Sequence, residues 1–150
     1  MTVLHQLAYY SYNRLPGDPC EVERQIQELL DSARRKNSRR GLTGALLFNR
    51  GCFAQILEGA RDAVECTFES IMQDERHTGV TVLSYGPIEE RVFGHWSMAF
   101  IGRHAPDQER FGPIAEVSGF DVSRVLREDL SRALLRLLRE EEMTGAGPLA

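Results

Sequence analysis

Two polar side chains lie in apolar stretches of this sequence, and they are the first candidates for chemistry. Gln55 alternates with Phe53 and Leu57, so the three side chains point to the same face of a strand. An amide buried there must satisfy up to four hydrogen bonds or cost about 1–3 kcal/mol. Tyr9 ends an apolar segment, and its hydroxyl needs an acceptor if it is buried. Functional polar groups and amides that merely bridge the backbone both fit this pattern.

Other polar or aromatic candidates are weaker when each is taken alone. Asn37 follows the first predicted helix and fits a C-terminal cap, while Trp96 and Met98 point together from the last predicted strand, as core residues do. The basic run 34–40 either contacts phosphate or nucleic acid, or is a solvated helix end that complements the helix dipole. The histidines have no ligand spacing, and the common nucleophile, phosphate-loop and dinucleotide motifs are missing. The sequence therefore does not predict an enzyme.

Alternating strands and helices carry these candidates. Asp18 and Pro19 are typical of a helix start, and apolar residues at spacings of three and four predict about four helical turns after them. Apolar runs on either side of 49–51 predict a hairpin. The predicted order is strand, helix, strand, strand, helix, strand, strand, over residues 3–11, 19–36, 43–48, 52–57, 61–74, 80–85 and 93–101, with a turn at Gly86–Pro87. Two helices on one face of a mixed five-stranded sheet make an α+β, ferredoxin-like sandwich.

The chain divides into a predicted core, residues 1–101, and a C-terminal extension, residues 102–150. Residues 102–119 are polar, and apolar residues at helical spacing over 122–138 predict an amphipathic helix. Such a helix must cover an apolar surface. We expect it to cover the sheet face that the other two helices leave bare, or to mediate assembly into a homo-oligomer.

Composition is that of an ordinary globular domain, with 150 residues, 42% hydrophobic and 27% charged. A net charge of −4 argues against direct binding to nucleic acid and against a polybasic membrane anchor. No apolar run is long enough to span a membrane. The three cysteines fit no metal-ligand spacing and are expected to be reduced thiols of a cytoplasmic protein.

Five motifs together resemble the BLUF family of flavin-binding blue-light sensors. They occur in the family's order over about two-thirds of the chain, and the sequences Leu-Thr-Gly, Gln-x-Leu-Glu-Gly and Trp-Ser-Met are their most specific parts. The motifs are Tyr9–Ser11, Asn37–Leu47, Gly51–Gly59, Asp74–His77 and Arg91–Met98. The family's fold is the ferredoxin-like arrangement predicted above, with the isoalloxazine ring held between the two helices.

This resemblance implies a bound FAD, with FMN as the alternative occupant. Tyr9 resembles the photoactive tyrosine, and Gln55 the switch glutamine between that phenol and the flavin; Trp96 and Met98 resemble the two residues that exchange places near it. The remaining cofactor-binding positions implied by the resemblance are Asn37 at the pyrimidine edge of the ring, Leu29 and Ile71 on its two faces, and Arg76 and His77 near the ribityl or phosphate tail.

Two positions depart from the family pattern: Lys36 stands where His or Asn is more common, and Ala33 stands where a polar residue is frequent. Both are expected to tune colour or recovery rate. The chain is similar to short members that act on a downstream effector protein in trans. Two alternatives remain, an acylphosphatase-like hydrolase and a dimerisation or ligand-binding module of the same fold without photochemistry; both would purify colourless.

Overall fold

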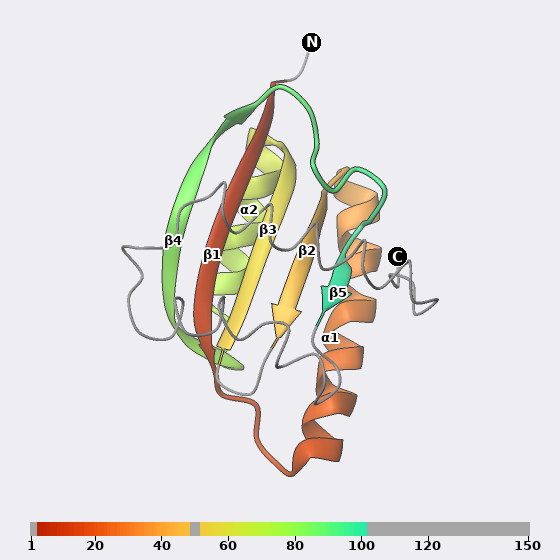
Figure 1. The fold of residues 1–150 in the computed structure, drawn as a ribbon, viewed down its shortest axis with the longest axis vertical. Helices are drawn as coiled ribbons and strands as arrows, with labels where there is room; N and C mark the ends of the chain where they lie inside the picture. Colours follow the sequence, from red (N-terminus) through yellow and green to blue (C-terminus); the bar gives the residue numbers. More distant parts are fainter. Residues whose placement is uncertain (1–2, 49–51, 102–150) are drawn as a thin grey trace.

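The computed structural model describes residues 3–48 and 52–101. Their strands and helices follow the predicted order (Figure 1). The elements are β1 (Leu4–Asn13), α1 (Pro19–Arg40), β2 (Thr43–Phe48), β3 (Cys52–Ala60), α2 (Arg61–Met72), β4 (His77–Ile88) and β5 (Ala99–Ile101). The predicted extension over residues 102–150 lies outside the described residues.

The strands form one mixed sheet in the order β4-β1-β3-β2-β5. Neighbouring strands are antiparallel except β2 and β5, which pair in parallel. Both helices lie on the same side of the sheet (Figure 1). This arrangement confirms the predicted α+β ferredoxin-like sandwich. No helix in residues 3–48 or 52–101 is long and apolar enough to cross a membrane.

Helix α1 begins as predicted but runs further. The side chain of Asp18 accepts a hydrogen bond from the Glu21 amide (2.9 Å), and Gly41 closes the helix in the left-handed conformation (φ 69°). The helix has 22 residues rather than about four turns, because no breaker precedes Gly41. Asn37 therefore lies inside the last turns of the helix, and the prediction that it follows the helix was wrong.

Strand β4 is longer than predicted and contains the Gly86–Pro87 pair expected to form a turn. Pro87 pairs with His5 and Gly86 with Gln6 across β1. A proline is tolerated there because β4 is at the edge of the sheet, where one side of the strand needs no hydrogen-bond donors.

Strand β5 is shorter than predicted, since only Ala99–Ile101 pair with β2. The amides of Val92 and Phe93 donate instead to the carboxylate of Glu58, both at 2.8 Å. The Trp96 amide then donates to the Phe93 carbonyl (3.1 Å), which forms a local turn. These competing partners remove residues 92–96 from the sheet ladder.

The core between sheet and helices uses alternate residues of the strands. Leu7 and Tyr9 of β1 face the helices with Phe53 and Leu57 of β3, and Leu30 of α1 packs against them. The residues that alternate with them along each strand, such as Gln6 and Glu58, occupy the opposite face. This alternation places Tyr9 and Gln55 beneath the two helices.

Candidate functional site between the two helices

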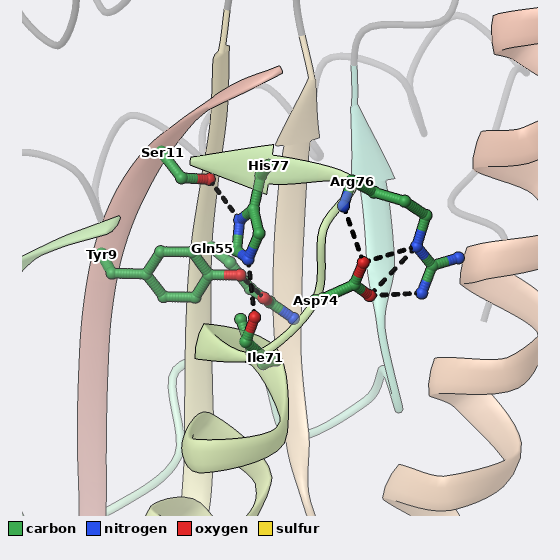
Figure 2. Close-up of polar contacts among 7 residues, drawn as sticks. All are labelled: Tyr9, Ser11, Gln55, Ile71, Asp74, Arg76 and His77. Carbon is green, nitrogen blue, oxygen red and sulfur yellow. Dashed lines mark hydrogen bonds and ion pairs between the residues drawn. The ribbon is translucent and has the colours of Figure 1, made fainter. Parts of the chain in front are cut away.

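Tyr9 and Gln55 form the centre of the site. They are direct partners in the β1–β3 register, and the Tyr9 hydroxyl donates a hydrogen bond to Gln55 Oε1 (Figure 2). Both side chains are buried. Burial raises the pKa of the Tyr9 phenol far above its ordinary value, and the nearby Asp74 carboxylate adds to the effect. The phenol is thus held neutral, with its proton already directed at an acceptor.

The other end of the Gln55 amide contacts Met98. Gln55 Nε2 donates to the thioether sulfur at 3.6 Å, and Met98 is fully buried. A thioether is a weak acceptor. The glutamine is therefore bound firmly at its oxygen and weakly at its nitrogen, so turning the amide costs chiefly the hydrogen bond from Tyr9.

A cavity of about 180 Å³ opens beside this pair, between α1 and α2. A water molecule occupies about 30 Å³ of liquid, so the space suits an organic ligand rather than a single ordered water. All seven residues that the resemblance assigns to cofactor binding line it: Tyr9, Leu29, Asn37, Gln55, Ile71, Arg76 and His77. The fold brings these residues together from β1, α1, β3, α2, and the turn and strand that follow α2.

Asn37 lies at the inner wall of the cavity. It is buried, and its Nδ2 donates to the Ser97 carbonyl at 2.8 Å. The side chain thus connects the cavity with the segment that leads into β5. An amide in this position presents both a donor and an acceptor to the edge of a planar heterocycle.

Asp74, Arg76 and His77 form a polar cluster at the end of α2 (Figure 2). Arg76 binds the Asp74 carboxylate through two nitrogens, which lowers the carboxyl pKa. His77 Nε2 donates to the Ile71 carbonyl (2.6 Å), and its Nδ1 lies 2.7 Å from Ser11 Oγ. With Nε2 as the donor, a neutral ring accepts from the Ser11 hydroxyl. The histidine therefore ties β1 to the end of α2 beside the cavity.

Trp96 and Met98, predicted to point together from a strand, precede β5 and behave differently. Met98 reaches Gln55, whereas the Trp96 ring packs near Phe93 and His95 with centroid distances of 6.4 and 5.9 Å. The Trp96 carbonyl accepts from the Gly44 amide (3.1 Å). The cavity is lined by neither residue. The turn at residues 93–96 breaks the period of two on which the prediction rested.

The basic run 34–40 divides between several roles. Arg34 donates to the Met98 carbonyl (2.9 Å), and Arg40 donates to the Thr67 hydroxyl of α2 (2.8 Å). Lys36 and Arg40 line the cavity. Arg35 and Arg39 are exposed, as expected for a solvated helix end.

Sequence reasoning missed the role of Glu58, which is fully buried on the opposite face of β3. Its two carboxylate oxygens accept from Gln6, Thr43, Val92 and Phe93 at 2.8–3.2 Å. Arg91 binds the Glu58 carbonyl and the Gly41 carbonyl beside it. The sequence did contain a signal for it, because Glu58 is an acidic residue that alternates with the apolar Ala54 and Ile56. The same alternation argument singled out Gln55 on the other face of the strand. The cavity-lining residues Ser32, Thr67 and Ser70 carried no comparable signal.

Comparison with known proteins shows the family to which this chain belongs. The sequence profile of the family described as "Sensors of blue-light using FAD" matches residues 4–99. The chain belongs to the BLUF family. The dark-state structure of the BLUF protein BlrB is 32% identical and superimposes with a TM-score of 0.74, covering 91% of this chain and 98% of that one. The photo-activated state of BlsA is 28% identical, with a TM-score of 0.73 over 89% of this chain and 94% of that one.

Curated BLUF relatives are much longer. The photoactivated adenylate cyclase subunit beta of Euglena gracilis is 36% identical over 98 residues, which are 65% of this chain and 11% of that protein. The blue light- and temperature-regulated antirepressor BluF of Escherichia coli (strain K12) is 36% identical over 78 residues, 52% of this chain and 19% of that protein. The chain therefore spans only a small part of the curated relatives that it matches.

A flavin fits the residues that line the cavity. Leu29 and Ile71 supply aliphatic surface from the two helices, Asn37 and Gln55 supply amides, and Lys36, Arg40 and Arg76 supply positive charge. A planar ring needs the first two kinds of group, and a phosphate tail suits the third. Among residues 3–48 and 52–101, no three His, Cys, Asp or Glu side chains converge on a metal site.

Proposed function

We propose that this chain is a blue-light receptor that holds FAD in the cavity between α1 and α2 and reports excitation through Tyr9 and Gln55. The single observation that supports it most is the buried hydrogen bond from the Tyr9 hydroxyl to Gln55 beside that cavity. FMN has the same ring and is the alternative occupant. The positive charges of Lys36, Arg40 and Arg76 favour a ligand with a phosphate tail.

In this proposal the two helices hold the ring by its faces, through Leu29 and Ile71, while Asn37 binds its pyrimidine edge. Asn37 is well placed because its backbone belongs to a helix and its side chain is buried. Arg76 and His77 extend the site toward the tail. When bound, the flavin supplies an excited state that accepts one electron.

Tyr9 then loses an electron and a proton together. Burial keeps the phenol neutral, so no phenolate exists from which an electron could leave alone. An oxidised phenol is a strong acid, and its proton passes along the existing hydrogen bond to Gln55 Oε1. When electron and proton return to Tyr9, the Gln55 amide would settle in a second arrangement, rotated or tautomerised, and a hydrogen bond from it to a bound flavin would shift the absorption to the red.

The change at Gln55 leaves the cavity through Met98. Gln55 Nε2 contacts the Met98 sulfur, and Met98 leads directly into β5. One hydrogen bond is worth about 1 kcal/mol, enough to bias a bistable segment. We propose that residues 102–150 cover the sheet face opposite the helices, and that the signal passes from Met98 through β5 to this extension.

The output would then reach a separate effector protein, and the chain itself would not be an enzyme. We propose assembly as a homo-oligomer through the extension, without direct contact to nucleic acid or membrane. A cytoplasmic location is supported by Cys20 and Cys66, which are exposed free thiols.

The test is the visible spectrum of the purified protein before and after blue light. We expect a yellow protein with a reversible red shift. Tyr9→Phe and Gln55→Leu should keep the flavin and lose the shift, whereas Tyr10→Phe, one residue away on the opposite face, should keep both. Mass spectrometry of the ligand released on denaturation distinguishes FAD from FMN. A colourless protein would favour the ligand-binding module or the hydrolase, and a normal shift in Tyr9→Phe would refute the role of the phenol.

A further inference from the structure

Met98 is held from two sides at the point where the chain enters β5. Its sulfur contacts the Gln55 amide (3.6 Å), and its carbonyl accepts from Arg34 Nε (2.9 Å). The two donors come from β3 and α1. Met98 itself is fully buried, so its position is fixed by these partners and by packing rather than by water.

Arg34 and Asn37 act on neighbouring carbonyls of this segment. They are three residues apart on α1 and therefore lie on the same face of the helix. Asn37 donates to the Ser97 carbonyl and Arg34 to that of Met98. Helix α1 thus holds two consecutive peptide groups just before β5.

The two tethers differ in their relation to the cavity. Asn37 lines it, so a bound ring competes for the same amide, whereas Arg34 does not line it. A hydrogen bond from a charged donor is also roughly twice as strong as one between neutral groups. The Arg34 tether can therefore persist with the cofactor in place.

We propose that Arg34 is a positioning residue that fixes the Met98 backbone and thereby keeps the thioether against the Gln55 amide. The inference rests on the proposed photoreceptor function. Arg34 does not line the cavity, and its Nε is bound to the Met98 carbonyl, so in this proposal it acts on Gln55 through Met98. It stabilises the arrangement in which Gln55 Nε2 is directed at sulfur, and so favours the return to that arrangement after light.

Thermal recovery after a blue-light pulse is the quantity to measure, in wild type, Arg34→Ala, Arg34→Lys and Arg35→Ala. Arg34→Ala should bind flavin and show the red shift but recover about three- to tenfold more slowly, the effect of losing roughly one hydrogen bond. Arg34→Lys restores a charged donor and should recover within about twofold of wild type. Arg35→Ala is the matched control, because Arg35 is the exposed neighbour on the same helix, and it should recover like wild type.

Hydrogen exchange in the dark provides a second measurement that needs no photochemistry. Amides of residues 97–101 should exchange faster in Arg34→Ala than in wild type or Arg35→Ala. Unchanged recovery in Arg34→Ala would refute the role of Arg34, as would slower recovery without faster exchange at 97–101. A wild-type protein without a red shift would refute the photoreceptor proposal itself and with it any role of Arg34 in recovery, whatever the exchange data show.

Discussion

The two central strands carry two polar pairs, and the pairs differ in how completely they are satisfied. Tyr9 lies opposite Gln55 and Gln6 opposite Glu58 in the same β1–β3 register. The residues of each strand are three positions apart, so the pairs lie on opposite faces of the sheet. The Glu58 carboxylate accepts from four donors, whereas the Gln55 amide has a strong partner in Tyr9 and a weak one in the Met98 sulfur.

This difference separates a structural group from a switchable one. Moving Glu58 would break several hydrogen bonds in a buried environment, and each buried donor left without a partner costs about 1–3 kcal/mol. Turning the Gln55 amide breaks two contacts, the hydrogen bond from Tyr9 and the weak one to the Met98 sulfur. The same two strands therefore provide a carboxylate with four donors on one face and an amide with two partners on the other.

Truncation of Glu58 should lower the stability of the protein more than any other change considered. Glu58→Ala leaves the Val92 and Phe93 amides and the Gln6 side chain without their acceptor, and should lower the free energy of unfolding by about 3–5 kcal/mol. Gln55→Ala is the matched truncation on the same strand. Chemical denaturation measures both, and equal losses in the two variants would contradict the distinction.

The second-largest effect on stability should come from the buried Tyr9 phenol at alkaline pH. The pKa of Tyr9 is raised in the folded protein, while in the unfolded chain it ionises near 10. Above that pH the unfolded state holds fewer protons, so stability falls with rising pH by about 1.4 kcal/mol per unit. The slope should be smaller by this amount in Tyr9→Phe. Equal slopes in wild type and Tyr9→Phe would contradict a raised pKa.

Truncation of Gln55 should have only a small effect on the stability of the protein. Gln55→Ala should lower the free energy of unfolding by about 1 kcal/mol, because Tyr9 lines the cavity and can find another acceptor there. Its effect on the light-induced shift should nevertheless be complete. A loss of stability comparable to that of Glu58→Ala would show that Gln55 is a structural group as well.

The smallest effect should come from the ion pair beside the cavity. Arg76→Gln should lower the free energy of unfolding by about 0.5 kcal/mol at neutral pH, because the pair is partly exposed. The Asp74 pKa is lowered mainly by Arg76, so the contribution is present above about pH 4 and is lost as the pH falls through the lowered pKa. Chemical denaturation of wild type and Arg76→Gln at neutral pH and in acid, below the lowered Asp74 pKa, measures the difference in stability. The difference should vanish in acid, and a difference that grows in acid would contradict the prediction.

Alternation and spacing predicted the parts of the site that regular structure carries. Gln55 stands out in an apolar row of β3, and the apolar stripe of α1 includes Leu29 on the wall of the cavity. Family motifs supplied the remaining roles. These residues could be placed from the sequence because their side chains follow the geometry of a strand or a helix.

Residues 89–98 could not be predicted in this way. Their course depends on Glu58, which takes the Val92 and Phe93 amides from more than thirty positions away. Such a contact leaves no periodic signal near Trp96 or Met98. For the same reason the tether from Arg34 was invisible in a basic run that resembled an ordinary helix end.

The register of β1 on β3 has a consequence for how this molecule can respond to light. Sliding β3 by one residue would turn its side chains over and carry the Glu58 carboxylate toward the cavity, and sliding β1 would carry the Tyr9 phenol to the opposite face. Such a slip would break the hydrogen bonds of the Tyr9–Gln55 and Gln6–Glu58 pairs together. We therefore expect the central strands to keep their register during the proposed photocycle, and movement to be confined to side-chain torsions and to the irregular connection before the last strand.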